Sequence, residues 1–547
     1  MRRASPASGA LWLLLAVLTA VWFGSLDYRK LIKPDEGRYA EIPREMVASG
    51  DWLTPRLDGL KYFEKPALQY WATAAAFTVF GEHDWSARLW PGLTGFLGIL
   101  MAWATGRRLF GPRPGLLAGA VLASCALYVA IGHANTLDMG FTFFLELALC
   151  AFLLGQDDEG AAPRRWRLLV WVALALAVLS KGIVALVLPG ATLVAYSLLN
   201  RDFAPWRRLE IARGLPLFLL IAAPWFVAVS LANPEFFHFF FIHEHFERFL
   251  TKVHGRYQPG WYFFPILAAG LLPWTLLALH AAARAWSADR AQAFAPRRFL
   301  LLWVLVVFGF FSASNSKLAS YILPLFPALA LLLGDFLDRC ARRTLALHLL
   351  PMLLAAAAAA LAAPRVALLG DAVTPPALLA DYAIWLTASA VLWFLGSGLA
   401  LWQARRNRLN GAILVAAAAG GLAGLGALLG HESLAPSNSA WQIAQQVKPL
   451  LKPGVPFYSV QSYDQTLPYY LDRTVTLVDY RDELDFGIAR EPEKWIASID
   501  EFKRRWAADG DAFAIMEPPT FRQLAGAPDL PMRVVAADTR RVIVRKP

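Results

Sequence analysis

Long apolar runs alternate with short polar segments along the chain up to about residue 430. A helix of such length can cross about 30 Å of hydrocarbon. The pattern therefore predicts about thirteen transmembrane helices in an all-α polytopic membrane domain over residues 1–430. The expected spans are residues 10–26, 86–106, 114–132, 136–155, 167–180, 183–199, 214–232, 261–283, 299–313, 319–334, 345–363, 380–404 and 411–430.

The first apolar run has the charged start and apolar core of a signal peptide. However, no small-residue cleavage site follows it, and acidic residues begin at once. We interpret it as a retained helix. The polar loop that follows, residues 27–85, is expected to contain amphipathic helices.

The pattern changes at His431. Short β-prone runs at residues 457–460, 475–478, 512–516, 534–537 and 542–544 alternate with helix-like stretches such as residues 493–508. This predicts a soluble α/β domain over residues 431–547 on the outer side of the membrane, which we interpret as accessory.

Composition supports a membrane protein, with 57% hydrophobic and 17% charged residues. The net charge of +11 does not indicate nucleic-acid binding, because the arginines gather in the loops that the positive-inside rule places in the cytoplasm. The three cysteines are too scattered for a disulfide framework or a metal site.

The inner loops contain no lysine, and the lysines of the membrane part all fall on the expected outer side. Topology does not explain lysines placed where positive charge is disfavoured, whereas binding of an anion does. Lys30 and Lys252 fit an interfacial anchor equally well. The outer lysines are Lys30, Lys33, Lys61, Lys65, Lys181, Lys252 and Lys317.

Residues 33–66 combine acids and bases at the membrane boundary, including Asp35, Glu36, Glu64 and Lys65. Ionisable groups at such a place are costly and are usually kept for function. We expect this segment to form one wall of an outward-facing active site. Glu64 and His245 are candidate ligands of a divalent metal, although the same pair also suits a plain hydrogen bond. No cofactor is otherwise required.

Four stretches resemble the bacterial aminoarabinose transferases that modify lipid A, and more widely the GT-C glycosyltransferases, which include protein O-mannosyltransferases. They are DEGRYAEIPREMVASGDWLTPRLDGLKYFEKPALQYW from Asp35, EHFERF from Glu244, WYFFPILAAGLLPW from Trp261 and SKLASYILPLFPALALL from Ser316. The first match is long and specific, and the others are looser. The resemblance covers essentially the whole chain, with a departure at Gly37, where a threonine is common in the family.

The resemblance implies an inverting transfer of 4-amino-4-deoxy-L-arabinose from undecaprenyl phosphate to a lipid A phosphate, at the periplasmic face of the bacterial inner membrane. Asp35 and Asp138 match the outer acids of the family, and Lys65, Arg248 and Tyr321 match groups near the polyprenyl phosphate. Further candidates in the outer loops are Glu36 for catalysis, Lys317, Arg256 and Tyr62 for the donor, and Arg38, Tyr39 and Lys61 for the acceptor or sugar.

Two other functions fit the pattern less well. One is a GT-C transferase that glycosylates protein or another glycan from a polyprenyl-phosphate sugar. The other is a transporter of lipid-linked sugar, which would show inverted repeats and intramembrane charges, whereas the apolar runs here are nearly free of charge. The pattern leaves open the oligomeric state and which lipid A phosphate is modified.

Overall fold

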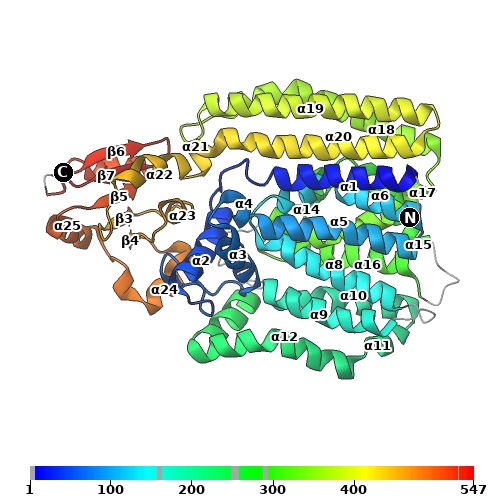
Figure 1. Cartoon of the computed structure of the whole chain (residues 1–547), viewed down its shortest axis with the longest axis horizontal. Coiled ribbons are helices and arrows are strands. Elements are labelled where there is room, and N and C mark those ends of the chain that lie inside the picture. The colour runs from blue at the N-terminus through cyan, green and yellow to red at the C-terminus, as the bar shows by residue number, and fades with distance from the viewer. Residues whose placement is uncertain (1–5, 157–162, 248–257, 288–293, 528) are drawn as a thin grey trace.

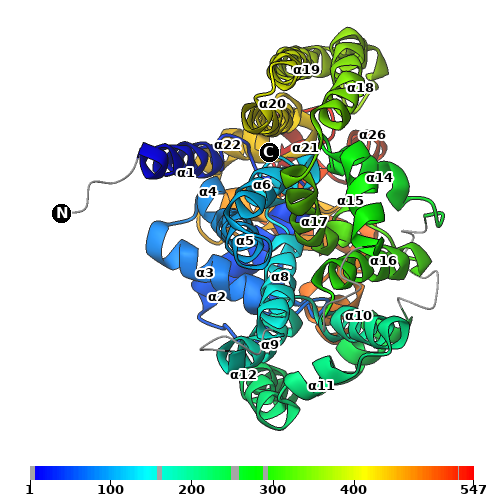
Figure 2. The ribbon, with the colours of Figure 1, turned by 90° about the vertical axis from the view of Figure 1, so that its right-hand side faces the viewer.

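The computed structural model describes residues 6–156, 163–247, 258–287, 294–527 and 529–547. Most of the described chain forms a bundle of long helices that lie side by side (Figures 1 and 2). The bundle consists of α1 (Pro6–Gly24), α5 (Leu89–Leu109), α6 (Pro112–Leu122), α7 (Ala126–Gly132), α8 (Leu137–Gly155), α9 (Pro163–Lys181), α10 (Val184–Asn200), α12 (Ile211–Ala232), α14 (Phe263–Gly270), α15 (Thr275–Ser287), α16 (Pro296–Ala313), η2 (Ala319–Leu325), α17 (Phe326–Asp338), α18 (Arg342–Ala362), α19 (Pro376–Arg405) and α20 (Leu409–Gly430).

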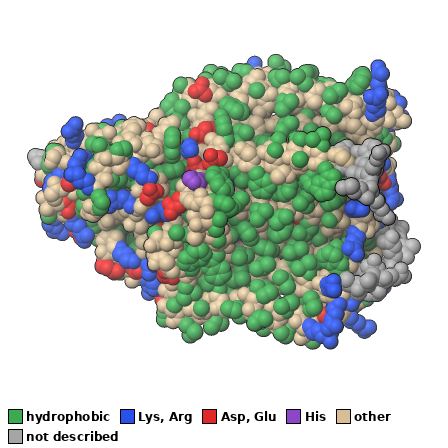
Figure 3. Space-filling view, viewed as in Figure 1, with side chains coloured by type: hydrophobic (Ala, Val, Ile, Leu, Met, Phe, Trp, Pro, Cys, Tyr) green, Lys and Arg blue, Asp and Glu red, His purple; other side chains and the backbone are tan. Residues whose placement is uncertain are grey.

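Each expected span overlaps one of these helices or a bent helix pair. Among the described residues, eight helices are long and apolar enough to cross a membrane, or up to ten if each bent pair counts as one span. Figure 3 shows a broad apolar band between two charged ends. The protein is therefore a multi-pass membrane protein.

Two expected spans are broken rather than straight. The α6–α7 pair bends by 67° and the α14–α15 pair by 103°. The two breaks meet, because the Ala126 N–H donates to the Leu272 carbonyl at 3.2 Å and the Trp274 indole donates to Ser124 Oγ at 2.8 Å. Backbone groups freed at one break are thus satisfied at the other, as the hydrocarbon region requires.

The loop after α1 folds into a compact layer at one end of the bundle, which we call the domain end (Figure 1). It contains α2 (Asp35–Ser49), the hairpin strands β1 (Arg56–Leu57) and β2 (Leu60–Lys61), α3 (Leu68–Phe80) and α4 (Asp84–Ala87). Two acids in the first turn of α2 complement the helix dipole. The helix ends at Ser49, and the next residue, Gly50, takes a φ of 74° and donates its N–H to the Met46 carbonyl.

Residues from His431 onward form an α/β domain beyond this layer. Its sheet has the order β4-β3-β5-β7-β6, with β3 parallel to β4 and β5, and β7 antiparallel to β5 and β6. The strands are β3 (Phe457–Val460), β4 (Thr476–Val478), β5 (Phe513–Met516), β6 (Arg533–Ala537) and β7 (Val542–Arg545), and the main helices are α22 (Trp441–Val447), α23 (Leu467–Leu471), α24 (Asp485–Arg490), α25 (Ile499–Ala508) and α26 (Pro518–Leu524).

All five expected strands are present, and the predicted fold class is confirmed. One helix boundary was wrong: α25 begins at Ile499 rather than at residue 493. The Ser498 hydroxyl caps its first turn by accepting from the Glu501 N–H, and residues Pro492–Lys494 form a separate 3-10 turn.

The α/β domain packs directly on the α2–α4 layer. The Tyr470 hydroxyl donates to Asp84 Oδ1 at 2.8 Å and accepts the Leu31 N–H at 2.7 Å. One buried apolar cluster contains residues of both parts, among them Tyr39 and Leu477. The layer is therefore enclosed between the helical bundle and the α/β domain.

Candidate active site

Asp35 is the first residue of α2, and its carboxylate is held by the side chain one turn later. The Arg38 guanidinium donates to Asp35 Oδ1 at 2.8 Å, and the Asp35 side chain stays 37% exposed while that of Arg38 is 5% exposed. Asp35 is thus oriented from the protein side and open on the other. This is the arrangement that a carboxylate needs if it is to meet a substrate.

Arg38 also contacts the α/β domain. Its second terminal nitrogen forms an ion pair with Glu483, whose other carboxylate oxygen accepts from Gln465 Nε2 at 2.5 Å. Burial raises the pKa of Glu483, and Arg38 opposes that shift. Glu483 lies in the short 3-10 turn Asp482–Leu484, far from Asp35 in sequence. Sequence reasoning missed it, since no local pattern marks a single acid after a strand.

Glu36 points to a different side of α2 from Asp35 and is buried. Arg88 donates to both its oxygens at 2.6 and 2.9 Å, and the Asn135 N–H donates at 3.0 Å. Burial disfavours the Glu36 carboxylate, but Arg88 and Arg29 outweigh this effect and lower its pKa to about 2. In this arrangement Glu36 anchors the start of α2, and its oxygens are occupied by protein donors.

A buried group of tyrosines surrounds Asp35 and Arg38. The rings of Tyr39 and Tyr70 lie 6.1 Å apart, and the hydroxyls of Tyr62 and Tyr70 have no hydrogen-bond partner among the described residues. Burial raises the pKa of each of these three phenols, and the Glu64 carboxylate adds to the shift. The structure therefore brings Asp35, Arg38, Tyr39, Tyr62 and Glu64 into one cluster, in which the buried Tyr62 hydroxyl has no hydrogen-bond partner among the described residues.

Glu64 and Lys65 close the same loop. The Lys65 ammonium donates to the Glu64 carbonyl at 2.7 Å and lies 3.9 Å from its carboxylate. Arg248, Arg256 and the side chain of His245 lie outside the described residues. No group of three or more possible metal ligands occurs among the residues that the structure describes. The pairing of Glu64 with His245 around a metal, and the phosphate roles of Arg248 and Arg256, remain predictions.

Lys61 and Lys317, two further outer lysines, also have protein partners. Lys61 in β2 forms an ion pair with Glu235 at 2.7 Å. The Lys317 ammonium is buried and donates to the carbonyls of Gln258, at 2.8 Å, and Ser314. Lys61 is 20% exposed in its side chain and thus remains within reach of a ligand, whereas Lys317 ties together two loops.

Asp138, Lys181 and Tyr321 form a second cluster at the domain end. Asp138 lies in the first turn of α8 and forms an ion pair with Lys181, the last residue of α9. The Lys181 ammonium lies 4.3 Å from the centre of the Tyr321 ring. This cluster is connected to the first one through Asn135, which precedes α8 and contacts Glu36.

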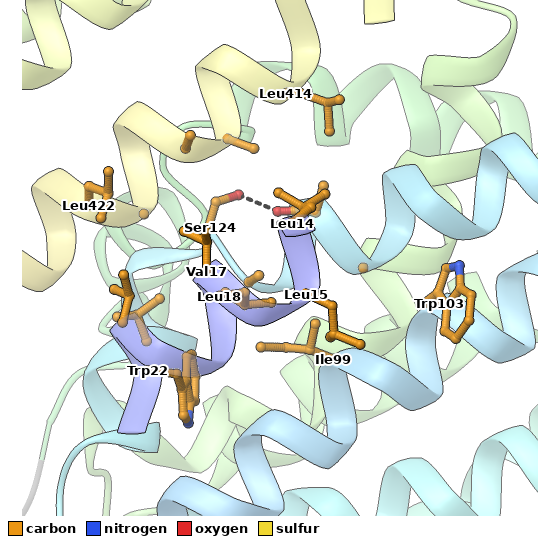
Figure 4. Close-up of a pocket in the computed structure, with 18 of the residues that line it drawn as sticks. Leu14, Leu15, Val17, Leu18, Trp22, Ile99, Trp103, Ser124, Leu414 and Leu422 are labelled. Carbon is orange, nitrogen blue, oxygen red and sulfur yellow. Dashed lines mark hydrogen bonds between the residues drawn. The ribbon is translucent and has the colours of Figure 1, made fainter. Parts of the chain in front are cut away.

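An apolar groove of about 370 Å³ opens between α1, α5, α6 and α20 (Figure 4). Leu14 and Leu18 of α1 and Leu414 and Leu422 of α20 line its walls, and none of the predicted site residues does. His133 lines it as well, and its carbonyl accepts from Arg29 at 2.8 Å. Arg29 in turn lies 3.8 Å from Glu36. The groove has the chemistry of a site for a hydrocarbon chain.

Two family models match separate parts of the chain. Residues 443–546 match the aminoarabinose transferase C-terminal domain, and residues 64–227 match the dolichyl-phosphate-mannose-protein mannosyltransferase family. An archaeal oligosaccharyltransferase from Archaeoglobus fulgidus, 12% identical with a TM-score of 0.51, shares the fold alone.

Curated relatives match over part of their length. An undecaprenyl phosphate-alpha-4-amino-4-deoxy-L-arabinose arabinosyl transferase of Sodalis glossinidius is 38% identical over 340 residues, which span 60% of each chain. The enzyme of the same name from Pseudomonas aeruginosa PAO1 is 39% identical over 333 residues, 59% of each chain. The aligned part of the chain thus covers less than two thirds of the length of each of these relatives.

The likeness extends over the full length in a solved structure. ArnT from Cupriavidus metallidurans, crystallised with undecaprenyl phosphate, is 42% identical in sequence to this chain. The two structures superpose with a TM-score of 0.93, and the match covers 98% of each chain. The domain-end layer, the bundle and the α/β domain all fall within this match. The chain therefore belongs to the aminoarabinose transferase family.

Proposed function

We propose that this protein is a glycosyltransferase that moves 4-amino-4-deoxy-L-arabinose from undecaprenyl phosphate to a phosphate of lipid A. The observation that carries the proposal is its likeness, over 98% of both chains at 42% identity, to a transferase crystallised with undecaprenyl phosphate. The Asp35 cluster at the domain end supports it, because it offers a partly exposed carboxylate that is held in place by Arg38.

The same proposal assigns the domain end to the periplasm. The opposite end of the bundle carries arginine-rich loops, for example Arg107–Arg108 at the end of α5 and Arg207–Arg208 at the end of α11 (Ala204–Arg208). Basic loops face the cytoplasm in bacterial membranes. We place residues 1–430 in the inner membrane as the catalytic domain and residues 431–547 in the periplasm.

The donor brings its own driving force, since its leaving group is a phosphate. Breaking the sugar–phosphate bond builds negative charge on undecaprenyl phosphate and positive charge on the sugar ring. Lys65 and Arg248 would stabilise the leaving phosphate, and the carboxylates of the site would stabilise the sugar. Attack from the opposite face inverts the anomeric carbon.

The acceptor determines the role of Asp35. A phosphate monoester is anionic at neutral pH and hardly needs deprotonation. Asp35 would therefore orient the acceptor or pair with the sugar ammonium, and a nearby cation such as Lys61 or Arg38 would offset the acceptor charge. If the acceptor were a hydroxyl, Asp35 would act as a general base. A metal held by Glu64 and His245 would supply further positive charge.

Lipid A mass spectra test this proposal. The protein is expressed in bacteria that lack their own aminoarabinose transferase but make the lipid-linked sugar. A lipid A mass increase by one aminoarabinose is expected from the wild type and not from Asp35→Ala. Glu82→Gln, which changes an exposed acid of the same loop, is the matched control. Unmodified lipid A in cells that accumulate the intact protein would contradict the proposal.

The match of residues 64–227 to the protein mannosyltransferase family keeps one alternative open, a transfer to protein or another glycan. The same cells decide between the two. Aminoarabinose on envelope proteins or glycans, with lipid A unchanged, would favour the alternative.

A further inference from the structure

Two cavities follow one another along α1. The apolar groove of about 370 Å³ is lined by α1 from Leu11 to Trp22. A second, polar cavity of about 290 Å³ begins just beyond α1, at Asp27. The chain between Trp22 and Asp27 can span at most about 17 Å. The two cavities are therefore close neighbours.

The same two parts of the chain line both cavities. In the groove these are α1 and α20 (Figure 4). In the polar cavity they are Asp27 and Lys30, which follow α1, and Trp441 of α22, which follows α20. Arg29 connects the two, because it lies beside Lys30 and donates to the carbonyl of His133, a residue of the groove, at 2.8 Å. The polar cavity thus lies at the end of the groove that faces the α/β domain.

This order of cavities matches the layers of a bilayer. The groove runs along a membrane helix, where the hydrocarbon region is, and the polar cavity lies beyond the end of that helix, at the depth of the lipid head groups. A molecule that fits both has a hydrocarbon chain and a polar head.

The polar cavity offers charges of both signs at its surface. Lys448 and Asp472 form an ion pair at 2.5 Å, and their side chains are 41% and 54% exposed. Asp27 is exposed, and its Oδ1 accepts the Trp85 N–H at 3.2 Å. Such groups exchange water for a ligand at little cost, since none of them is buried. A head group with both a phosphate and an ammonium complements them.

The contacts of Lys30 indicate which kind of ammonium fits. The Lys30 ammonium donates to Asp84 at 2.7 Å and lies 4.8 Å from the centre of the Trp441 ring. The ring is thus already used by a cation, whereas a quaternary ammonium would need aromatic faces of its own. A primary ammonium instead donates hydrogen bonds to carboxylates such as Asp27 and Asp472. A head group with no cation would be repelled by the same acids.

We infer that the groove and the polar cavity together bind one phospholipid with a phosphoethanolamine head group, in the leaflet at the domain end. One acyl chain lies in the groove, the phosphate meets Lys30 and Lys448, and the primary ammonium meets Asp27 and Asp472. The lipid joins α1 and α20 to the α/β domain. It is a structural partner rather than the donor or the acceptor, and the inference does not rest on the proposed function.

Lipid binding to the purified protein in detergent tests this inference. Phosphatidylethanolamine, phosphatidylcholine and phosphatidylglycerol with the same acyl chains are titrated, and native mass spectrometry gives the Kd of each. We expect one phosphatidylethanolamine per protein, with a Kd at least about tenfold lower than those of the other two lipids. The same lipid should raise the thermal unfolding midpoint most.

Three variants test the two cavities separately. Asp27→Asn should raise the Kd of phosphatidylethanolamine about tenfold and leave that of phosphatidylcholine unchanged. Lys448→Met should weaken both lipids, because they share the phosphate. Ala418→Trp, at an exposed position of α20 that lines the groove, should also weaken both, because the indole takes the place of the acyl chain.

The controls change exposed residues outside both cavities. Lys452→Met and Ala358→Trp make the same replacements in the α/β domain and in α18, and both should bind phosphatidylethanolamine as wild type does. If Asp27→Asn does not fold, Lys448→Met decides the role of the polar cavity, since its side chain is exposed.

Three results would overturn the inference. One is an equal Kd for the three phospholipids in the wild type. Another is wild-type binding of phosphatidylethanolamine by Ala418→Trp or by Lys448→Met. The third is displacement of phosphatidylethanolamine by an equal concentration of undecaprenyl phosphate, which would make the site one for the polyprenyl chain. None of these measurements uses transfer to lipid A, so failure of the proposed function would leave the result unchanged.

Discussion

Arg38 in α2 forms an ion pair with Glu483 in the α/β domain, while its other terminal nitrogen holds Asp35. Three residues from two parts of the protein thereby form one chain of contacts that ends at the exposed carboxylate of the candidate site. The α/β domain, which the sequence pattern suggested to be accessory, thus contributes a side chain that supports the candidate site.

This contact predicts that Glu483→Gln lowers activity without unfolding the protein. The amide cannot compensate the charge of Arg38, so Arg38 is expected to turn toward Asp35 and neutralise it. We expect a fall in kcat of at least about tenfold. Transfer assays in proteoliposomes measure it. Glu493→Gln, an exposed acid of the same domain, should behave as wild type. Equal activities of the two variants would show that Glu483 does not support the candidate site.

Asp35→Asn should reduce transfer by about 100-fold or more, the range for a carboxylate that works in the transition state. The amide keeps the size of the side chain but carries no charge for the sugar or the acceptor. Asp35→Glu should retain partial activity. Single-turnover rates with undecaprenyl-linked donor provide the measurement, and near-full activity of the asparagine variant would exclude an essential role for Asp35.

Arg88→Met should destabilise the protein strongly. It leaves Glu36 buried with neither of the two Arg88 hydrogen bonds, at an expected cost of about 3–5 kcal/mol. Arg88→Met with Glu36→Gln should lose less, because no charge then remains unpaired. Thermal unfolding midpoints in detergent test both. If the double variant were less stable than Arg88→Met, Glu36 would have to stabilise the fold through contacts other than those with Arg88.

At neutral and alkaline pH, Asp58→Asn should stabilise the contact between the β1–β2 hairpin and the α/β domain. Burial raises the pKa of Asp58, the Val475 N–H that donates to it at 2.7 Å opposes this, and Glu41 adds to the rise. The folded state thus binds a proton more tightly than the unfolded chain. Wild-type stability falls as pH rises above the unfolded pKa of about 3.9 toward the folded pKa.

The asparagine cannot ionise, so the stability difference between variant and wild type should grow with pH and vanish in acid. Asparagine also tolerates the φ of 56° at this position. Thermal midpoints measured across a pH series reveal the trend. Asp500→Asn, an exposed acid of the α/β domain, is the control. A constant difference at all pH values would contradict ionisation as the cause.

Gly37→Ala should weaken the contact of α2 with the α/β domain. A Cβ at this position would lie 2.6 Å from the backbone C and O atoms of Gln465, which cannot move as a flexible side chain could. Lower stability and lower transfer activity are expected together. Gly510→Ala, where a Cβ meets open space, should change neither. Wild-type behaviour of Gly37→Ala would mean that the two parts can separate without loss.

The sequence alone predicted the membrane bundle and the five strands of the α/β domain, and its prediction that the candidate residues face outward stays a prediction. These features follow from hydrophobic length, from period-two alternation and from the distribution of arginine and lysine, which are local properties of the chain. The resemblance of the stretch that begins at Asp35 also led to the family, since a long motif carries its chemistry with it.

The tertiary structure alone decided how the acids divide their work. Asp35 and Glu36 are neighbours in sequence, yet one faces the site and the other is buried against Arg88, because successive residues of a helix point about 100° apart. Glu483 and Lys181 reach their partners only through packing of distant segments. Which charge is neutralised by which depends on such contacts, and burial then determines how strongly each pair is held.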